Sequence, residues 1–537
     1  MFEKGSKVYC VGIKGTGLSA LAELLHGSGV LVSGSDTADV FYTDGILKSL
    51  AIPYFESFAP EHVPGDADLV IHSAAYSAES IGEGQIESNC ELAEALRRGI
   101  PVMKYTDALG AWSTRFESAG ISGVHGKTTT TALAGVLVRA AGLPAQVLAG
   151  SAVSSFGERS TLNNGGAFFI AETCEYRKHF LSFHPKHIVL TAVESDHQDF
   201  FPTYESIRDA FVEYALLLPE GGSLIYCADD KGACEVAELV RKSKRGIRFV
   251  PYGFTAAGDY RLSGYHAEHE KAHFDLALDE KRGGGAFTLS VPGKHNALNA
   301  AAALALIYTL SPGVVDGPDT VRRMKTGLDE FHGSKRRFEI IGERDGILFM
   351  DDYAHHPTAI SATIDGLREF FPTRRIVVSF MSHTYTRTAA LLDEFAASLA
   401  KADVVVLHKI YASARENCEK YEDVPAGESL YETLFKKVTA LSLDKVDVDA
   451  LCKNFALARE NYEKYENVPV GKSLGEKLFE QVKALKKHHV FYAHEHQSEA
   501  AALLLRSVLK PGDLFITMGA GDNWKLGISV LCQERFD

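Results

Sequence analysis

The stretch GISGVHGKTTTT, residues 120–131, decides the fold of the chain around it. A short apolar run leads into a glycine turn, and Lys127 and Thr128 then begin a predicted helix that continues to residue 141. Glycines let the backbone approach an anion, the N–H groups at the helix start face it, Lys127 neutralises phosphate oxygens, and Thr128 can ligate Mg²⁺. The stretch therefore predicts a nucleotide phosphate site, with loop residues Gly123, Val124, His125, Gly126, Lys127, Thr128 and Thr129.

The pattern is not a strict Walker A motif. Ile121 stands where that motif has its first glycine, so a simple glycine turn between a strand and a helix is the alternative interpretation. The required order of strand, turn, Gly-Lys-Thr and helix favours the phosphate site.

Length and composition set the class of protein. A chain of 537 residues is too long for one core and fits about three domains of roughly 100 to 200 residues. It is 46% apolar and 23% charged, which is ordinary for a globular protein, and a net charge of -14 argues against binding nucleic acid.

Its eight cysteines are scattered without CxxC spacing, which favours a reducing cytoplasm over a disulfide framework or a zinc site. The first residues lead directly into a predicted strand, with no leader and no apolar run long enough for a membrane span. We therefore expect a cytoplasmic protein with no membrane insertion.

The first block, residues 1–107, alternates short β-branched runs with helical stretches and predicts a parallel α/β domain. Strands are expected at 8–11, 30–33, 69–72 and 102–105, with helices at 18–26 and 90–98. A glycine turn from Gly12 to Gly17 follows the first strand, and Asp36 ends the second, where dinucleotide folds place an acid. Because the glycines read GxxGxG, not GxGxxG, the turn predicts a diphosphate-containing nucleotide or else a bare tight turn.

The second block, residues 108–333, contains the phosphate loop, strands at 167–171 and 188–191, an antiparallel insert within 261–291 and a helix at 296–306. The third, residues 334–537, predicts a further α/β unit with strands at 347–350, 376–380, 404–407 and 514–517 and helices at 357–370 and 389–400. Inside it, residues 407–441 recur as 451–485, which indicates a local tandem duplication because a solenoid needs at least three copies. Which copy lies near the active site is open, although the first continues directly from a predicted strand.

Acidic and histidine residues follow two strands of the second block. Glu172 and His197 come just after the strands expected to flank the phosphate loop, where ligands of open parallel sheets collect. Oxygen and imidazole donors there suit Mg²⁺, with Mn²⁺ also possible. Taken alone, Glu172 is as well explained as a helix cap, and His197 as a core or surface histidine. Because both follow the phosphate loop, the two residues together predict a metal site with Thr128.

Three further groups carry possible chemistry. Asn296 and Asn299 share one helical face, where paired carboxamides can meet an adenine edge, although an N-cap is the simpler interpretation. Residues 336–337 are both arginine and 351–352 both aspartate, so this block can supply phosphate and ribose contacts. Arg387, in the loop SHTYTRT, can fix a carboxylate, or the loop is solvated with a helix N-cap at Thr386 or Thr388.

The order of motifs resembles the Mur ligase family nearly end to end. The segments that carry this resemblance are GIKGTGLSALA with GSD, GVHGKTTTT, CEYRKHF, ESDHQDFF, GKHNALNAAAA, RRFE, DDYAHHPTAI, SHTYTRT, IYASAREN and TMGAGDNW. The family plan implies an N-terminal Rossmann-like domain that binds the UDP substrate, a central P-loop ATPase domain with a mainly parallel sheet, and a C-terminal Rossmann-like α/β domain.

The resemblance also implies roles for individual residues. Lys127, Glu172, His197 and Arg337 would be catalytic, with the metal held by Thr128, Glu172 and His197. The nucleotide would also meet Asn296, Asn299, Arg337 and Asp351 or Asp352; the UDP substrate would meet Gly12, Gly15, Thr16, Gly17, Ser19 and Asp36; and the amino acid and reacting carboxylate would meet Tyr353, His355, His383 and Arg387.

The implied activity is ATP-dependent ligation of L-alanine to UDP-N-acetylmuramate, by a monomer or weak homodimer acting on small molecules. Three alternatives are open: a ligase that joins a preformed tripeptide to the same sugar, a nucleotide-gated binding protein without ligase chemistry, and a nicotinamide-dependent dehydrogenase. SHTYTRT and TMGAGD favour the first activity over the tripeptide ligase, and the glycine order disfavours the dehydrogenase.

Overall fold

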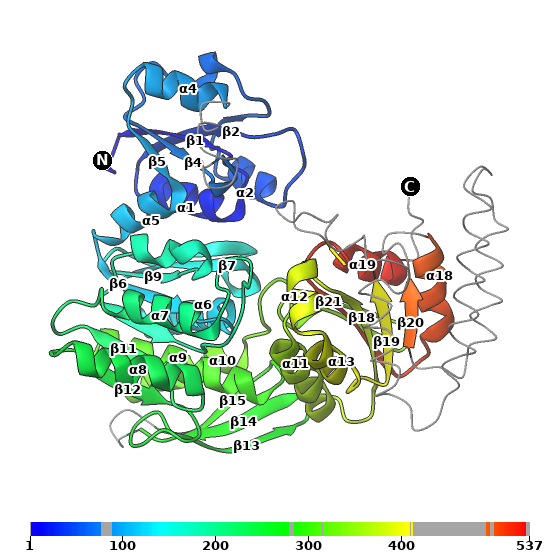
Figure 1. The fold of residues 1–537 in the computed structure, drawn as a ribbon. Helices are drawn as coiled ribbons and strands as arrows, with labels where there is room; N and C mark the ends of the chain where they lie inside the picture. The colour runs from blue at the N-terminus through cyan, green and yellow to red at the C-terminus, as the bar shows by residue number, and fades with distance from the viewer. Residues whose placement is uncertain are drawn as a thin grey trace, which may run out of the picture. The chain divides into compact units, whose positions relative to one another are not determined.

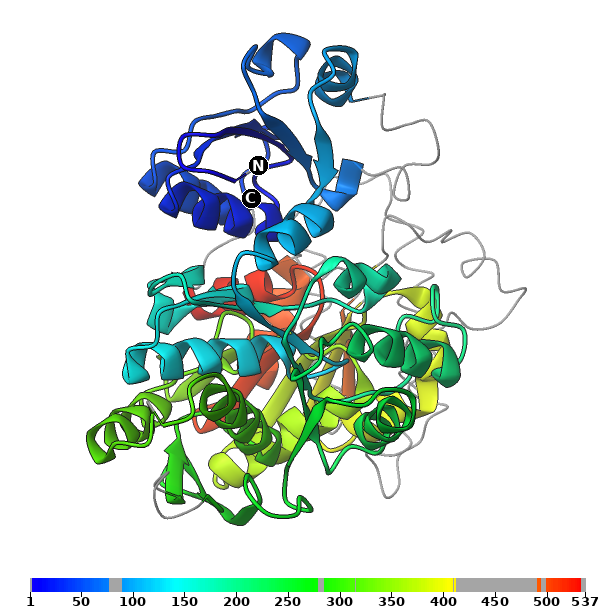
Figure 2. The same cartoon turned by 90° about the vertical axis from the view of Figure 1, so that its left-hand side faces the viewer.

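The computed structural model describes residues 2–76, 89–278, 284–313, 315–408, 410–411, 490–493 and 499–532. The chain forms two compact units. The first comprises residues 1–266, 271–291 and 295–335, and the second comprises residues 267–270, 292–294 and 336–537. Figures 1 and 2 show the elements of both units. The predicted boundaries at 107/108 and 333/334 stay predictions.

The first sheet of unit 1 is parallel, with strand order β3-β2-β1-β4-β5. Its strands are β1 (Lys7–Val11), β2 (Leu31–Ser35), β3 (Tyr54–Phe55), β4 (Leu69–His72) and β5 (Val102–Lys104). Its helices are α1 (Thr16–Gly27), α2 (Thr43–Ser49), α4 (Cys90–Arg97) and α5 (Tyr105–Ser113), with 3₁₀ turns η1 (Pro60–His62) and η2 (Ala74–Tyr76).

Alternation along β1 explains why helices cover both faces of this sheet. Val8 and Cys10 pack with the leucines of α1, whereas Tyr9 and Val11 pack with Leu92 of α4. Figure 1 shows α1 and α4 on opposite sides of the strands. The strand order reverses between β1 and β4, which is where doubly wound sheets bind ligands.

The second sheet of unit 1 has the order β12-β11-β10-β6-β9-β7-β8, parallel except where β8 pairs with β7. The strands are β6 (Glu117–Ser122), β7 (Ala145–Val153), β8 (Arg159–Asn163), β9 (Phe168–Glu172), β10 (His187–Leu190), β11 (Ser223–Cys227) and β12 (Arg248–Tyr252). The helices are α6 (Lys127–Ala141), α7 (Tyr204–Ala215), α8 (Lys231–Ser243), α9 (Lys294–Leu310) and α10 (Pro318–Asp329), with η4 (Ser154–Phe156) and η5 (Tyr176–Ser182). The predicted antiparallel insert forms a sheet of β13 (Leu262–Glu268), β14 (Lys271–Leu276) and β15 (Gly285–Leu289).

Unit 2 contains a sheet with the order β16-β17-β21-β18-β19-β20, in which β16 is the antiparallel edge. Its strands are β16 (Glu339–Arg344), β17 (Ile347–Asp352), β18 (Arg375–Met381), β19 (Val404–His408), β20 (Val490–Ala493) and β21 (Asp513–Gly519). Its helices are α11 (Pro357–Phe370), α12 (Tyr385–Ala390), α13 (Leu392–Leu399), α18 (Glu499–Val508) and α19 (Trp524–Cys532). Figure 1 shows α11 beside α13, and α18 beside α19.

The α/β fold class and the sequence-predicted strands are confirmed, whereas one predicted helix and one alternative assignment of a helix cap are wrong. The single helix expected over residues 389–400 is two helices, because Leu391 has φ -121° and ψ 30° between them. The cap of α12 is Thr384, whose hydroxyl accepts from the Arg387 N–H, and not Thr386 or Thr388.

Candidate functional site

The loop between β6 and α6 has the predicted phosphate-binding conformation. Gly123 and Gly126 have φ angles of 132° and 81°, where a side chain is strained. A Cβ on Gly123 would lie 2.2 Å from Thr191 Oγ1, and one on Gly126 would lie 2.5 Å from Asn299 Oδ1. The Thr191 hydroxyl donates to the carbonyl of His125 and so ties the loop to the end of β10. Shape alone therefore requires both glycines.

Lys127 begins α6 and is held by a buried carboxylate. Its ammonium donates to Glu175 Oε1 and Oε2 at 3.0 and 2.9 Å, and also to the carbonyl of Gly123. Burial by itself raises the pKa of Glu175, but the charges of Lys127 and His197 lower it to about 2. Burial lowers the pKa of Lys127, but the charge of Glu175 raises it above its ordinary value. Both groups are therefore charged at neutral pH.

The predicted metal ligands come from three segments around this lysine. Thr128 Oγ1 donates to Glu172 Oε1 at 3.1 Å, and the other oxygen of Glu172 accepts from the Gly150 N–H at 2.7 Å. His197 has a φ of 53°, an uncommon conformation for a residue with a side chain, and its ring lies 4.8 Å from that of Tyr176. The structure brings Thr128 and Glu172 into direct contact and connects His197 to Lys127 through Glu175.

The two asparagines of α9 are buried behind the loop. Asn299 Nδ2 donates to Asn296 Oδ1 at 3.0 Å, and Thr130 on α6 donates to Asn299 Oδ1 at 3.2 Å. In this arrangement Asn299 supports the loop at Gly126. That the pair also meets a nucleotide base stays a prediction.

The predicted UDP site lies at the switch point of the first sheet. Gly12 has a φ of 81°, and a Cβ on it would lie 2.8 Å from both Ser73 Cβ and the Tyr76 ring. Asp36 accepts from the Lys14 N–H at 2.6 Å with one oxygen and from the Thr37 N–H at 2.8 Å with the other. Asp36 thus shapes the turn, and its contact with a substrate stays a prediction. The remaining predicted residues lie in the turn or first turn of α1: Gly15, Thr16, Gly17 and Ser19.

In unit 2, Arg336 is built into the fold. Its guanidinium donates to Asp351 Oδ2 at 2.8 Å and to the carbonyls of Gly519 and Gly521 at 2.8 and 2.7 Å. Its φ is 60°, which a residue with a side chain rarely adopts. Arg336 therefore fastens the chain to the loop after β21.

Arg337, the predicted catalytic arginine, shares one contact with Arg336. The two guanidinium groups lie 5.2 and 5.0 Å from the centre of the Tyr353 ring, both cation–π distances. Asp352 accepts from the Phe338 and Ala354 N–H groups at 2.9 and 2.8 Å. Burial raises the pKa of Asp352 to about 6, against the lowering effect of Arg337. The contacts of Arg337, Asp351 and Asp352 with nucleotide stay predictions.

The residues predicted for the amino acid form a cluster at the carboxyl ends of β17 and β18. His355 Nδ1 lies 2.7 Å from the Tyr353 carbonyl, and the rings of His355 and His383 are 6.1 Å apart. Arg387 Nη1 lies 3.4 Å from His383 Nδ1, and Arg387 is buried. The Tyr411 ring lies 5.9 Å from that of His383. The structure therefore brings all four predicted residues together and adds Tyr411.

The start of the first repeat copy belongs to this cluster. Residues 407, 408, 410 and 411 are described, and Tyr411 forms an isolated β-bridge with His383. The rest of that copy and all of residues 451–485 lie outside the described residues. In the second copy Phe455 stands in the place of Tyr411, a difference that could have pointed to the first copy.

Sequence reasoning missed Glu175 and Tyr411 as members of these sites. Glu175 was visible as a second acid three residues after Glu172, but its partner lies 48 residues away in sequence.

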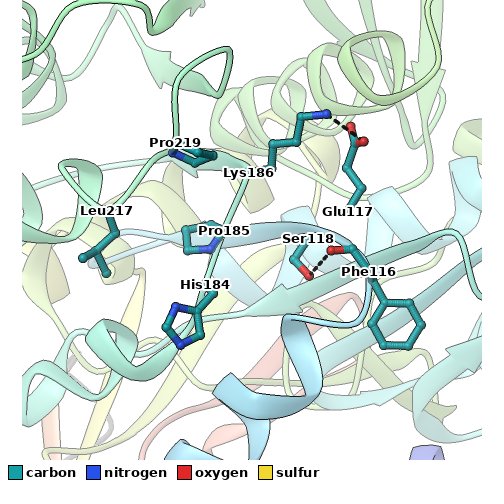
Figure 3. Close-up of a pocket in the computed structure, with 8 residues that line it drawn as sticks. All are labelled: Phe116, Glu117, Ser118, His184, Pro185, Lys186, Leu217 and Pro219. Atoms are coloured by element: carbon teal, nitrogen blue, oxygen red, sulfur yellow. Dashed lines mark hydrogen bonds and ion pairs between the residues drawn. The ribbon is translucent and has the colours of Figure 1, made fainter.

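Figure 3 shows a pocket elsewhere in unit 1, near the starts of β6 and β10, where Lys186 donates to Glu117 at 2.8 Å. It is lined by Phe116, Glu117, Ser118, His184, Pro185, Lys186, Leu217 and Pro219, none of them a predicted site residue. Within the described ranges, no helix has both the length and the apolar character needed to cross a membrane.

Comparison with known proteins gives the family. Residues 7–117 match the model described as "Mur ligase family, catalytic domain", residues 121–307 the "Mur ligase middle domain", and residues 336–461 the "Mur ligase, glutamate ligase domain". The chain is 47% identical over 527 residues to the UDP-N-acetylmuramate–L-alanine ligase of Treponema pallidum, covering 97% of this chain and 95% of that protein. The chain belongs to the Mur ligase family.

Solved structures of Mur ligases share the fold. The UDP-N-acetylmuramate–alanine ligase of Thermotoga maritima aligns over 98% of both chains with a TM-score of 0.67 at 22% identity. A second Thermotoga maritima Mur ligase, solved in complex with ADP, aligns over 89% of this chain and 97% of its own with a TM-score of 0.56 at 16% identity. The Mur ligase three-domain plan thus accounts for the three α/β sheets described above.

Proposed function

We propose that this Mur ligase is an ATP-dependent enzyme that joins L-alanine to the carboxylate of UDP-N-acetylmuramate in peptidoglycan synthesis. The full-length similarity to the Treponema pallidum ligase supports the substrates, and the loop carrying Lys127 supports the use of ATP. We further propose that it works in the cytoplasm as a monomer or weak homodimer on small molecules.

The chemistry follows from the weakness of a carboxylate as an electrophile. A carboxylate oxygen attacks the γ-phosphorus of ATP, ADP leaves, and an acyl phosphate forms. The amine of L-alanine then attacks the acyl carbon, phosphate leaves with the C–O bond pair, and the amine gives up a proton. Lys127 and the loop N–H groups after Gly123 would hold the phosphates and spread the charge of the transferring group.

A divalent cation fits the residues that are present. Thr128 and Glu172 offer two oxygen donors 3.1 Å apart, and His197 is held in a strained backbone conformation nearby in the same unit. Mg²⁺ prefers such oxygen ligands together with substrate phosphates. When bound, it would neutralise phosphate charge, with Thr128, Glu172 and His197 as its protein ligands.

In unit 2, we propose that Tyr353, His355, His383 and Arg387 recognise the amino acid and the reacting carboxylate. Arg387 supplies a buried guanidinium, which pairs well with a carboxylate, beside an imidazole that can accept a proton.

One assay tests the proposal against its rivals. ADP release is measured with ATP, UDP-N-acetylmuramate and, in turn, L-alanine, glycine, L-serine or a stem tripeptide. L-alanine should give the highest kcat/KM, although one small group separates the three amino acids by only ~1 to 3 kcal/mol. Faster turnover of the tripeptide would indicate the recycling ligase, and ADP binding without amino-acid-dependent turnover would indicate a binding protein.

Lys127→Ala is the control variant for this assay. It should lower kcat/KM by at least about 100-fold, since one preorganised charge at the transition state contributes several kcal/mol. Because the change also leaves Glu175 buried without its ammonium partner, circular dichroism must show that the variant is folded before its rate is interpreted.

A further inference from the structure

Glu175 is a buried acid that none of the roles above uses. It lies after β9, three residues beyond Glu172, and its side chain is only 2% exposed. A carboxylate is costly to bury unless charged or hydrogen-bonding partners surround it. The identity of these partners therefore shows what the residue does.

Both partners are proposed site residues from other segments. Lys127, at the start of α6, donates to both carboxylate oxygens at 3.0 and 2.9 Å. His197, in the loop after β10, places Nε2 3.6 Å from Oε1 of the same carboxylate. One side chain thus joins the phosphate-binding lysine to the metal-binding histidine.

The other contacts of His197 fix its backbone and one side of its ring. Its N–H donates to Asp196 Oδ1 at 2.7 Å, its carbonyl accepts from the Phe200 N–H at 2.8 Å, and the Tyr176 ring lies 4.8 Å from its own. Among the residues that the structure describes, Glu175 and Asp196 have carboxylates within ion-pair distance of the ring, Asp196 at 3.8 Å. An acid beside one ring nitrogen of a metal-binding histidine orients the ring and strengthens it as a ligand.

We propose that Glu175 is a positioning residue that sets the orientation of Lys127 and His197 together, and so couples phosphate binding to metal binding. This inference rests on the proposed ATP-dependent function. Glu175 acts through its two partners, whereas Glu172 is proposed as a metal ligand.

The first test follows the histidine. Mn²⁺ binding to the full chain with saturating ADP is measured by electron paramagnetic resonance for wild type, Glu175→Gln and Glu175→Asp. Glu175→Gln keeps the shape and should weaken Mn²⁺ binding about tenfold, the usual lower limit for loss of such a partner. Glu175→Asp should recover part of the loss because it restores the charge. The matched control is Glu213→Gln, which breaks an exposed pair with Lys178 and should leave Mn²⁺ binding unchanged.

The second test follows the lysine. ADP affinity without metal is measured for Glu175→Gln, Lys127→Met and the double variant. Glu175→Gln should change ADP affinity at least about threefold in the wild-type background and have no such effect in the Lys127→Met background, because the residue acts through Lys127. Circular dichroism checks that Lys127→Met is folded, and if it is not, the Mn²⁺ measurement alone decides the proposal.

These outcomes separate the inference from the proposed function. Wild-type protein that binds neither ADP nor Mn²⁺ would overturn the function and the inference together. Two results would overturn the role of Glu175 and leave the function standing, provided that the wild-type protein binds normally. One is an unchanged Mn²⁺ affinity in Glu175→Gln, and the other is an equal effect of Glu175→Gln on ADP affinity in both backgrounds.

Discussion

The two ends of α6 offer a matched pair of substitutions that tests the geometry of the phosphate loop. Gly126 precedes the helix with a φ of 81°, and Gly142 follows it with a φ of 69°. Both positions therefore require the left-handed conformation. They differ in their surroundings, because a Cβ on Gly126 would lie 2.5 Å from Asn299 Oδ1, whereas a Cβ on Gly142 would have nothing within 4 Å.

The free-energy difference between the variants can be worked from these contacts. Alanine in the left-handed region costs about 1 kcal/mol at either site. Gly126→Ala must also displace Asn299, whose carboxamide accepts from Thr130 at 3.2 Å and donates to Asn296 at 3.0 Å. Leaving such buried groups without partners costs about 1 to 3 kcal/mol. We expect Gly126→Ala to lower the free energy of unfolding by about 2 to 4 kcal/mol, and Gly142→Ala by about 1 kcal/mol.

Urea denaturation followed by circular dichroism measures both values, and because both glycines flank one helix, both variants report on the same domain. ADP affinity should fall in Gly126→Ala and stay unchanged in Gly142→Ala. Adding Asn299→Ala to Gly126→Ala removes the displaced oxygen, so the double variant should lose less than the sum of the single losses. Equal destabilisation by the two glycine substitutions, or strict additivity with Asn299→Ala, would refute this account of the loop.

Two further predictions concern unit 2. Arg336→Lys loses the hydrogen bonds to Asp351 and two carbonyls and should lower the free energy of unfolding, measured by urea denaturation, by about 2 to 4 kcal/mol. Arg337→Lys should lower it by less than about 1 kcal/mol and instead reduce turnover. The opposite ranking would contradict the assignment of Arg336 as structural. The pKa of Asp352 is raised to about 6 in the folded state, so the folded state binds this proton more tightly than the unfolded chain does. The stability that protonated Asp352 contributes is therefore full below about pH 4 and is lost as pH rises through about 6. Asp352→Asn lacks this loss, so its unfolding free energy relative to wild type should rise by up to about 3 kcal/mol between pH 4 and pH 7.5, and a difference that does not change with pH would disprove the shift.

The fold could be predicted where elements are buried and continuous. The strands of residues 69–72 and 376–380 are runs rich in β-branched residues and are buried on both faces, and such runs are recognised as strands from the sequence alone. Other strands could not be predicted so well. β7 contains Gly150 and has exposed and half-buried positions near its end, and β16 has a register shift around Gly342 where it pairs with β17. A half-exposed strand with a glycine lacks the pattern that marks a strand.

The site could be predicted where its chemistry is local in sequence. Lys127 and Thr128 follow from the order of strand, glycine turn and helix, and that order is contained in one short stretch. The residues alone did not distinguish Arg336 from Arg337, and only the family resemblance pointed to Arg337, because adjacent residues of the same type differ only in the direction that the backbone gives each side chain. Here Arg336 has the left-handed φ that turns it toward the loop after β21.

Glu175 gives a physical reason for the proposed dependence on a divalent cation. A phosphate-binding loop usually contributes a lysine charge against the phosphates, but here Glu175 lies against the ammonium of Lys127 and largely cancels its field at a distance. Glu172 accepts a hydrogen bond from Thr128, which follows Lys127, and adds a further negative charge beside the loop. The loop of this chain thus offers N–H groups and shape but little net positive charge. A triphosphate carrying several negative charges would be held weakly there by the protein alone, so most of the neutralisation must come from a cation bound between Thr128, Glu172 and the phosphates. On this reasoning ADP should bind the wild-type chain much more weakly in EDTA than with Mg²⁺, and the difference should shrink in Glu175→Gln, where the field of Lys127 is no longer cancelled.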